Sequence, residues 1–208
     1  MSNAKAAPSD APAAPQDPVR IRILRGAAQV FADRGYGPTS VEAILEAAEV
    51  SRRTFYRAFR SKEDVLRALY DNSVEMLVRA VRDAGDRRKS RVERAIAGVE
   101  AYIRVHANAG PLARVLLLEQ FAPGSPLAPQ RDRAMATFIK LISRASARVG
   151  QPEPDPILVT AVVSALNQVC VQMATEYPQG NWDVERAKRI MLHILAVLDD
   201  GSEPIGVR

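Results

Sequence analysis

A short cationic segment, residues 51–57, carries the side chains whose types and spacing best suit binding to nucleic acid. Ser51 is a helix-capping residue type, and four large polar side chains follow it: Arg52, Arg53, Tyr56 and Arg57. Apolar residues occupy the opposite face at helical spacing: Phe55, Ala58 and Phe59. A short helix that is anchored on one side and cationic on the other fits the DNA major groove.

The flanking residues predict the helices that must hold this segment. Thr39 followed by Glu42 forms a capping box at the start of a helix over about residues 39–48. Ser61 followed by Asp64 caps the next helix, with Lys62 in its first turn. Upstream, a helix is predicted from Pro18 to about residue 34, where Gly35 ends it. The pattern is a helix-turn-helix with a supporting helix before it.

The run from Thr39 through Leu66 resembles the helix-turn-helix signature of TetR-family transcriptional regulators. The resemblance rests on eleven positions: Ser40, Val41, Ile44, Ala48, Val50, Ser51, Thr54, Tyr56, Phe59, Lys62 and Leu66. It covers roughly residues 18–80, and the remainder agrees in length and helical character. Glu49 departs from the pattern, because the family usually has glycine in this turn. A non-glycine residue there predicts a changed turn geometry, and its carboxylate would repel phosphate.

The predicted DNA contacts lie on the helix-turn-helix: Thr39, Ser40, Arg52, Arg53, Thr54, Tyr56, Arg57 and Lys62. Arg52 and Arg53 are assigned to base edges because they lie in the first turn of the second helix. Thr54, Tyr56, Arg57 and Lys62 are assigned mainly to phosphates.

The charge distribution supports this assignment. Residues 18–62 contain 9 Lys and Arg against 4 Asp and Glu, whereas the whole chain of 208 residues has a net charge of +5. The excess positive charge is therefore concentrated where phosphate would lie. A merely solvated cationic face is the alternative. The clustered arginines, the tyrosine among them and the consistent caps favour DNA.

Further helices are predicted over about residues 61–84, 91–107, 111–121, 127–149, 157–177 and 181–199, and no strand pattern is found. The fold class is therefore all-α, with a TetR-like arrangement of nine helices. The chain divides into a disordered tail (1–17), a DNA-binding domain (18–62), a connecting helix (63–84), an effector-binding and dimerisation domain (85–199) and a second disordered tail (200–208).

The last two predicted helices are long and apolar. The resemblance implies that they form the interface of a homodimer; core packing within a monomer is the alternative. A charge at Leu166 or Ile194 should weaken such a dimer, or unfold the chain if the position faces its own core. The apolar tract at residues 157–174 contains Thr, Ser, Asn and Gln, which makes it a poor membrane span.

The resemblance also implies a pocket for an apolar or amphipathic small molecule among the central helices. Polar and aromatic residues within otherwise apolar helices are the candidates for contacting it: Tyr102, His106, Glu119, Gln120, Phe121, Phe138, Asn167, Gln168 and Gln172. Each of these, taken alone, is more often a structural residue than a ligand contact.

These observations predict a one-component transcriptional regulator, a repressor. It would bind a pseudo-palindromic operator as a homodimer and be released by its effector. A protein-interaction module without DNA binding is an alternative. A helical enzyme is disfavoured, because His106 and His193 lie on different helices and no metal, cofactor or nucleophile motif is present. Because Cys170 is the single cysteine, no intrachain disulfide can form, which indicates a reducing compartment, the cytoplasm. We expect Cys170 to be a core residue; a redox sensor is the alternative.

Overall fold

The computed structural model describes residues 17–86, 91–147 and 154–199, and these residues form helices and no strand. The prediction of an all-α fold with nine helices is confirmed for this part of the chain. In chain order the helices are α1 (Pro18–Arg34), α2 (Val41–Ala48), α3 (Arg52–Ala58), α4 (Lys62–Asp86), α5 (Arg91–Ala109), α6 (Pro111–Glu119), α7 (Ala128–Ala147), α8 (Pro156–Glu176) and α9 (Val184–Asp199). The predicted tails lie outside the described residues, apart from Asp17, which caps α1.

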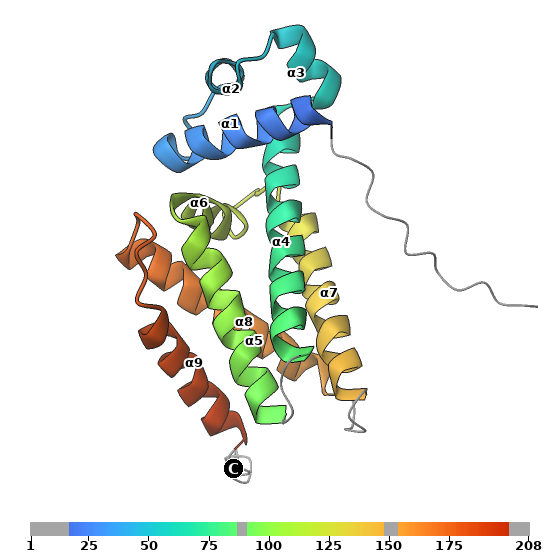
Figure 1. Ribbon diagram of the computed structural model, residues 1–208, viewed down its shortest axis with the longest axis vertical. Helices are drawn as coiled ribbons and strands as arrows, with labels where there is room; N and C mark the ends of the chain where they lie inside the picture. The colour runs from blue at the N-terminus through green and yellow to red at the C-terminus, as the bar shows by residue number, and fades with distance from the viewer. Residues whose placement is uncertain (1–16, 87–90, 148–153, 200–208) are drawn as a thin grey trace, which may run out of the picture.

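Helices α1 to α3 form a head that sits across one end of α4 (Figure 1). These three helices and the start of α4 share one hydrophobic core. Its fully buried side chains include Phe31 from α1, Ile44 from α2, Phe55 from α3 and Leu66 from α4. Burial of the aromatic face of α3 leaves its opposite face directed away from the protein.

The caps of the head agree with the sequence in two places and differ in one. The Ser51 hydroxyl accepts from the Thr54 backbone N–H at 3.1 Å, and the Ser61 hydroxyl accepts from Asp64 at 3.3 Å. The predicted Thr39 capping box is wrong, because Ser40 caps α2 by accepting from the Ala43 N–H at 3.2 Å. The Thr39 hydroxyl instead donates to the Gly35 carbonyl at 2.7 Å, inside the turn after α1.

The remaining helices form the body. The axes of α4, α5 and α7 lie roughly parallel below the head, with α5 running back toward it; α8 crosses behind them, and α9 lies alongside α5 (Figure 1). A second core fills the body, with fully buried side chains at Ile103, Leu117, Cys170 and Met191. Leu166 belongs to this core and is 7% exposed. Of the two outcomes predicted for a charge at Leu166, unfolding of the chain is therefore the expected one, because the charge would disrupt the monomer's own packing.

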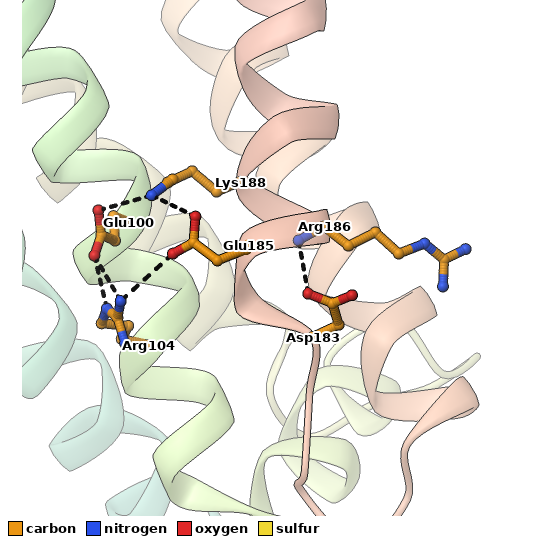
Figure 2. A network of polar contacts seen from close by, with 6 residues as sticks. All are labelled: Glu100, Arg104, Asp183, Glu185, Arg186 and Lys188. Carbon is orange, nitrogen blue, oxygen red and sulfur yellow. Dashed lines mark hydrogen bonds and ion pairs between the residues drawn. The ribbon is translucent and has the colours of Figure 1, made fainter.

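A chain of ion pairs fixes α9 against α5 (Figure 2). Lys188 of α9 pairs with Glu100 of α5 at 3.3 Å and with Glu185 of its own helix at 2.8 Å. Arg104 pairs with Glu100 at 2.8 Å and with Glu185 at 3.7 Å. Exposed pairs contribute little individually, so the network's main consequence is the register of the two helices.

Head and body are joined by α4 and α6. Helix α4 passes from the first core to the second without a break, and α6 packs against α1. The Tyr70 hydroxyl of α4 donates to Gln120 Oε1 at 2.8 Å, and Arg131 of α7 donates to the Gln120 carbonyl at 3.0 Å. A movement of α4 relative to α6 or α7 would therefore be transmitted to the head.

Candidate DNA-binding surface and ligand cavity

The outer face of α3 presents four exposed polar side chains: Arg52, Arg53, Tyr56 and Arg57. Phe55 anchors the helix from within, and its ring meets the Tyr56 ring edge to face at 5.3 Å between centroids. The predicted separation into a buried aromatic face and an exposed cationic face is what the structure shows. This face can enter a groove without disturbing the core of the head.

Arg52 is held by a neighbour on α2. Its guanidinium forms an ion pair with the carboxylate of Glu42, and both side chains are 61% exposed. A pair this exposed is weak and easily exchanged for a DNA group. Arg53 has no ion-pair partner among the described residues, so it is the more available of the two predicted base-reading arginines.

The turn between α2 and α3 depends on Glu49. Its backbone lies in the left-handed region, with φ 51° and ψ 47°, and its N–H donates to the Glu46 carbonyl at 3.1 Å. Val50 N–H donates to the Leu45 carbonyl at 3.1 Å. Glu49 therefore adopts the conformation that glycine would take at little cost, and the turn accommodates the unusual residue by strain.

We expect Glu49→Gly to stabilise the protein. A left-handed non-glycine residue costs about 1–2 kcal/mol, and the added freedom of glycine in the unfolded chain offsets about half of this. The free energy of unfolding in urea should rise by about 0.5–1 kcal/mol. Glu46→Gly is the matched control, because it removes the same charge from the exposed face of α2 but should cost about 1 kcal/mol. Equal changes in the free energy of unfolding of the two variants would show that the backbone at Glu49 is not strained.

Lys62 is engaged within the protein. Its ammonium donates to the backbone carbonyls of Tyr36, Gly37 and Thr39 at 2.9, 3.2 and 2.7 Å. It also lies 4.4 Å from the centre of the Tyr36 ring. All three N–H donors are thereby used, and the turn before α2 is fixed to the start of α4. A phosphate contact by Lys62 would require the exchange of one of these bonds.

The other predicted contacts differ in accessibility. Ser40 is exposed at the start of α2, and Thr54 is half-buried beside Ser51. Thr39 is only 3% exposed, so very little of its surface is accessible to a phosphate. Its hydrogen bond to Gly35 gives it a structural role in the turn instead.

Arg20 holds α1 against α3 through contacts that the sequence pattern did not predict. Its guanidinium lies 4.2 Å from the centre of the Phe59 ring and donates to the Ala58 carbonyl at 3.3 Å. It thus ties α1 to the C-terminal end of α3, where a cation is favourable to the helix dipole. The 38 positions that separate Arg20 from Ala58 hide this contact from any local pattern.

The body contains a cavity of about 210 Å³ between α4, α5, α6, α7 and α8. Five predicted effector contacts line it: Tyr102, His106, Gln120, Phe138 and Asn167. Its walls are otherwise mainly aliphatic, as in small-molecule sites. The structure thus brings together residues that lie as far apart in the sequence as Tyr102 and Asn167, which are separated by 65 positions.

The remaining four candidates lie away from this cavity. Phe121 is 53% exposed, with the Arg131 guanidinium 5.6 Å from its ring centre. Glu119 is half-buried at the end of α6. Gln168 and Gln172 lie on the exposed face of α8, because the buried positions of that helix are Val163, Leu166, Cys170 and Met173.

The polar groups of the cavity are ordered by hydrogen bonds. The Tyr102 hydroxyl donates to Asn167 Oδ1 at 2.8 Å, and His106 Nδ1 lies 3.0 Å from the Tyr102 carbonyl. The Tyr102 and Phe138 rings pack with centroids 5.7 Å apart. Burial lowers the pKa of His106 to about 4, so the imidazole is neutral at pH 7.

His106 should make the protein less stable in mild acid. Its folded-state pKa of about 4 lies below the ordinary value of 6.5, so the unfolded chain binds more protons between these values. The free energy of unfolding is unaffected by this group above pH 6.5 and falls as pH is lowered toward 4, by about 2–3 kcal/mol in all. Urea unfolding from pH 7 to 4 should show a shallower decline for His106→Gln, whereas the exposed His193→Gln should keep the native slope. Parallel curves for all three proteins would contradict a neutral His106.

Cys170 is fully buried, and burial raises the pKa of its thiol well above the usual range. Because the thiolate is the reactive form, the structure favours a packing role over redox sensing.

The outer surfaces of α8 and α9 carry exposed apolar side chains. Ile157 is 79%, Leu158 44% and Ile190 40% exposed. By length and composition α8 could also cross a membrane, although helices in the cores of soluble proteins pass the same test. Its inner face packs against α5, α6, α7 and α9, so its outer face is the part that no described residue of the monomer covers.

Comparison with known proteins agrees with this geometry. Residues 23–69 match the family model of bacterial regulatory proteins of the TetR family. The chain is 35% identical over 88 residues to the transcriptional activator FasR of Mycolicibacterium smegmatis, covering 42% of this chain and 40% of that protein. It is 50% identical over 46 residues to the transcriptional regulator TcmR of Streptomyces glaucescens, covering 22% and 20% of the two chains. The chain therefore matches less than half of the length of these relatives, which are regulators rather than enzymes.

Solved structures share most of the fold. A TetR-family regulator from Syntrophomonas wolfei superposes with a TM-score of 0.74 at 18% identity, covering 90% of this chain and 98% of that one. FadR from Bacillus subtilis, solved in complex with stearoyl-CoA, gives a TM-score of 0.71 at 16% identity, covering 84% and 96%. The nine-helix arrangement is thus the fold of TetR-family regulators.

Proposed function

Because its DNA-binding segment and its fold are those of the TetR family, we propose that the chain is a one-component transcriptional repressor. It binds a pseudo-palindromic operator as a homodimer and is released by a small-molecule effector. The observation that carries the proposal is the exposed cationic face of α3 on a buried aromatic anchor, within the segment that matches the family model. This function places the protein in the cytoplasm, with the DNA.

The contacts with DNA divide by position. Arg52 and Arg53 read base edges from the first turn of α3. Five further residues contact phosphates: Ser40, Thr54, Tyr56, Arg57 and Lys62. Residues 18–62 serve as the DNA-binding domain, 63–84 as the connecting helix and 85–199 as the effector and dimerisation domain.

Arg53→Ala should weaken binding to the operator by about 1–3 kcal/mol and relax preference at one base pair. The duplex is obtained by selecting bound DNA from a random library, and affinity is measured by fluorescence anisotropy over a series of salt concentrations. Arg79→Ala is the control, because Arg79 is exposed and paired with Glu75 on α4. An equal loss for Arg53→Ala on selected and random DNA would count against base reading, and failure of the native protein to enrich any duplex would overturn the proposed function.

The dimer forms through α8 and α9. One seven-residue recognition helix reads too few base pairs for strong specificity, so two copies are required. The exposed apolar side chains of α8 and α9 supply the surface for an isologous interface. Gln168 and Gln172 lie on the same side of α8 and take part in this interface rather than in the cavity.

Release of the operator requires a ligand that binds more tightly to the dimer with one spacing of its two heads than to the dimer with the other. The cavity is bounded by α4, the helix that carries the head, so an occupant can alter its position. A coupling of about 1–3 kcal/mol is ordinary for such a switch. By reciprocity, operator DNA should weaken effector binding by the same factor by which the effector weakens operator binding.

A further inference from the structure

The hydrogen-bonding state of His106 determines what its free nitrogen can bind. A backbone carbonyl can only accept, so the 3.0 Å contact with the Tyr102 carbonyl requires His106 Nδ1 to donate. In the neutral ring Nε2 then has a lone pair and no proton. Within the described part of the chain Nε2 has no hydrogen-bond partner, and His106 lines the cavity. The wall therefore offers a hydrogen-bond acceptor.

Asn167 supplies the complementary group. Its Oδ1 accepts from the Tyr102 hydroxyl at 2.8 Å, which fixes the orientation of the amide. The Nδ2 group has no partner among the described residues, and Asn167 also lines the cavity. The Tyr102 ring links the two sites, since its centroid lies 4.8 Å from that of His106. The wall therefore offers an acceptor and a donor on two residues that both contact Tyr102.

Size and charge restrict the ligand further. A cavity of roughly 150 Å³ holds benzene in an engineered protein, so about 210 Å³ holds a single ring with a small substituent. The stearoyl chain of the ligand bound to FadR from Bacillus subtilis would exceed this volume. Among the described residues of the wall Arg131 alone is charged, and it already donates to the Gln120 carbonyl and pairs with Asp132. An anion would therefore find no free positive partner.

We propose that the effector is a neutral single-ring compound whose hydroxyl group donates to His106 Nε2 and whose oxygen accepts from Asn167 Nδ2. A phenol is the simplest member of this class, because its single hydroxyl group can both donate and accept a hydrogen bond. This inference rests on the proposed function, since it specifies the ligand of the same cavity. The aromatic pair of Tyr102 and Phe138 provides the wall against which the ring packs.

Phenol, toluene and benzoate are the probes, because they share a ring and differ in hydrogen bonding and charge. Trp182, the single tryptophan, lies parallel to the His106 ring at 6.5 Å, so its fluorescence reports binding alongside titration calorimetry. At pH 7 phenol should bind at least about tenfold more tightly than either other probe. Toluene would leave polar groups of the wall unpaired, and benzoate would bury a charge.

Variants of His106 distinguish a hydrogen bond to the ligand from packing against its ring. His106→Phe keeps a ring beside Trp182 and should remove the preference for phenol over toluene while retaining toluene binding. His106→Gln returns an acceptor and should restore part of the preference. His193→Gln, on the exposed face of α9, should behave as the native protein.

The two proposals fail in different ways. A protein that binds its selected duplex but does not prefer phenol to toluene would overturn the ligand class and leave the regulator intact. Preference for phenol that survives His106→Phe would overturn the assigned acceptor. Absence of specific DNA binding would overturn the regulator whatever the probes show.

Discussion

A charge at Leu158 is expected to convert the proposed dimer into monomers and to weaken operator binding by about 100-fold or more. Leu158 is 44% exposed on α8, beside Ile157, and both would be buried by a second copy of the chain. An unpaired carboxylate in that interface is costly, and loss of one copy removes the gain of about 10²–10⁴ that linked binding sites provide. Light scattering gives the mass, and anisotropy on a duplex with two half-sites gives the affinity.

Leu118→Glu is the matched control for Leu158→Glu. Leu118 is 38% exposed on α6 rather than on α8 or α9, so its variant should remain a dimer with native affinity. Ile190→Glu on α9 should reproduce the effect of Leu158→Glu from the second helix of the interface. If Leu158→Glu and Leu118→Glu have the same mass and affinity, the dimer does not use this surface.

The sequence predicted those features that depend on residues within one or two turns of each other. The alternation of Phe55 and Phe59 with the arginines set the orientation of α3, and the caps at Ser51 and Ser61 followed from local side-chain chemistry. Helix α8 was different, because apolar residues surround its first half and periodicity could not choose its inner face. The sequence therefore left Leu166 open between an interface and the monomer's core, whereas tertiary packing buries it and exposes Ile157.

The parts of the sites that escaped prediction depend on long-range contacts or on backbone energy. Arg20 reaches Ala58, and Lys62 reaches the carbonyls 23 to 26 positions earlier, through tertiary packing alone. Five of the nine candidate cavity residues meet because α5, α6, α7 and α8 converge, which composition does not encode. The sequence marks Glu49 as unusual for this turn, but only the backbone shows that it adopts the left-handed conformation and preserves the turn.

Gly26→Ala is expected to destabilise the protein although it replaces glycine within a helix. A Cβ atom at Gly26 would lie 2.7 Å from the Ala48 nitrogen and 2.9 Å from the Ala47 carbonyl carbon. Both are backbone atoms of α2, so relief requires α1 and α2 to separate. Overpacking of this kind costs about 1–3 kcal/mol, which exceeds the gain of about 0.5–1 kcal/mol that alanine usually brings to a helix. The free energy of unfolding in urea should therefore fall.

The same change should also weaken DNA binding, because a shift of α2 moves the turn at Glu49 and the start of α3. Gly98→Ala is the control, since a Cβ there would make an ordinary contact of 3.5 Å with Val81 Cγ1 in the body. Its stability should be unchanged or higher by up to about 1 kcal/mol, with native affinity for the operator. A Gly26→Ala protein as stable as Gly98→Ala would mean that α1 and α2 can separate at no cost. The position of α3 would then depend on the contacts of Arg20 and Lys62 rather than on the packing of α1 against α2.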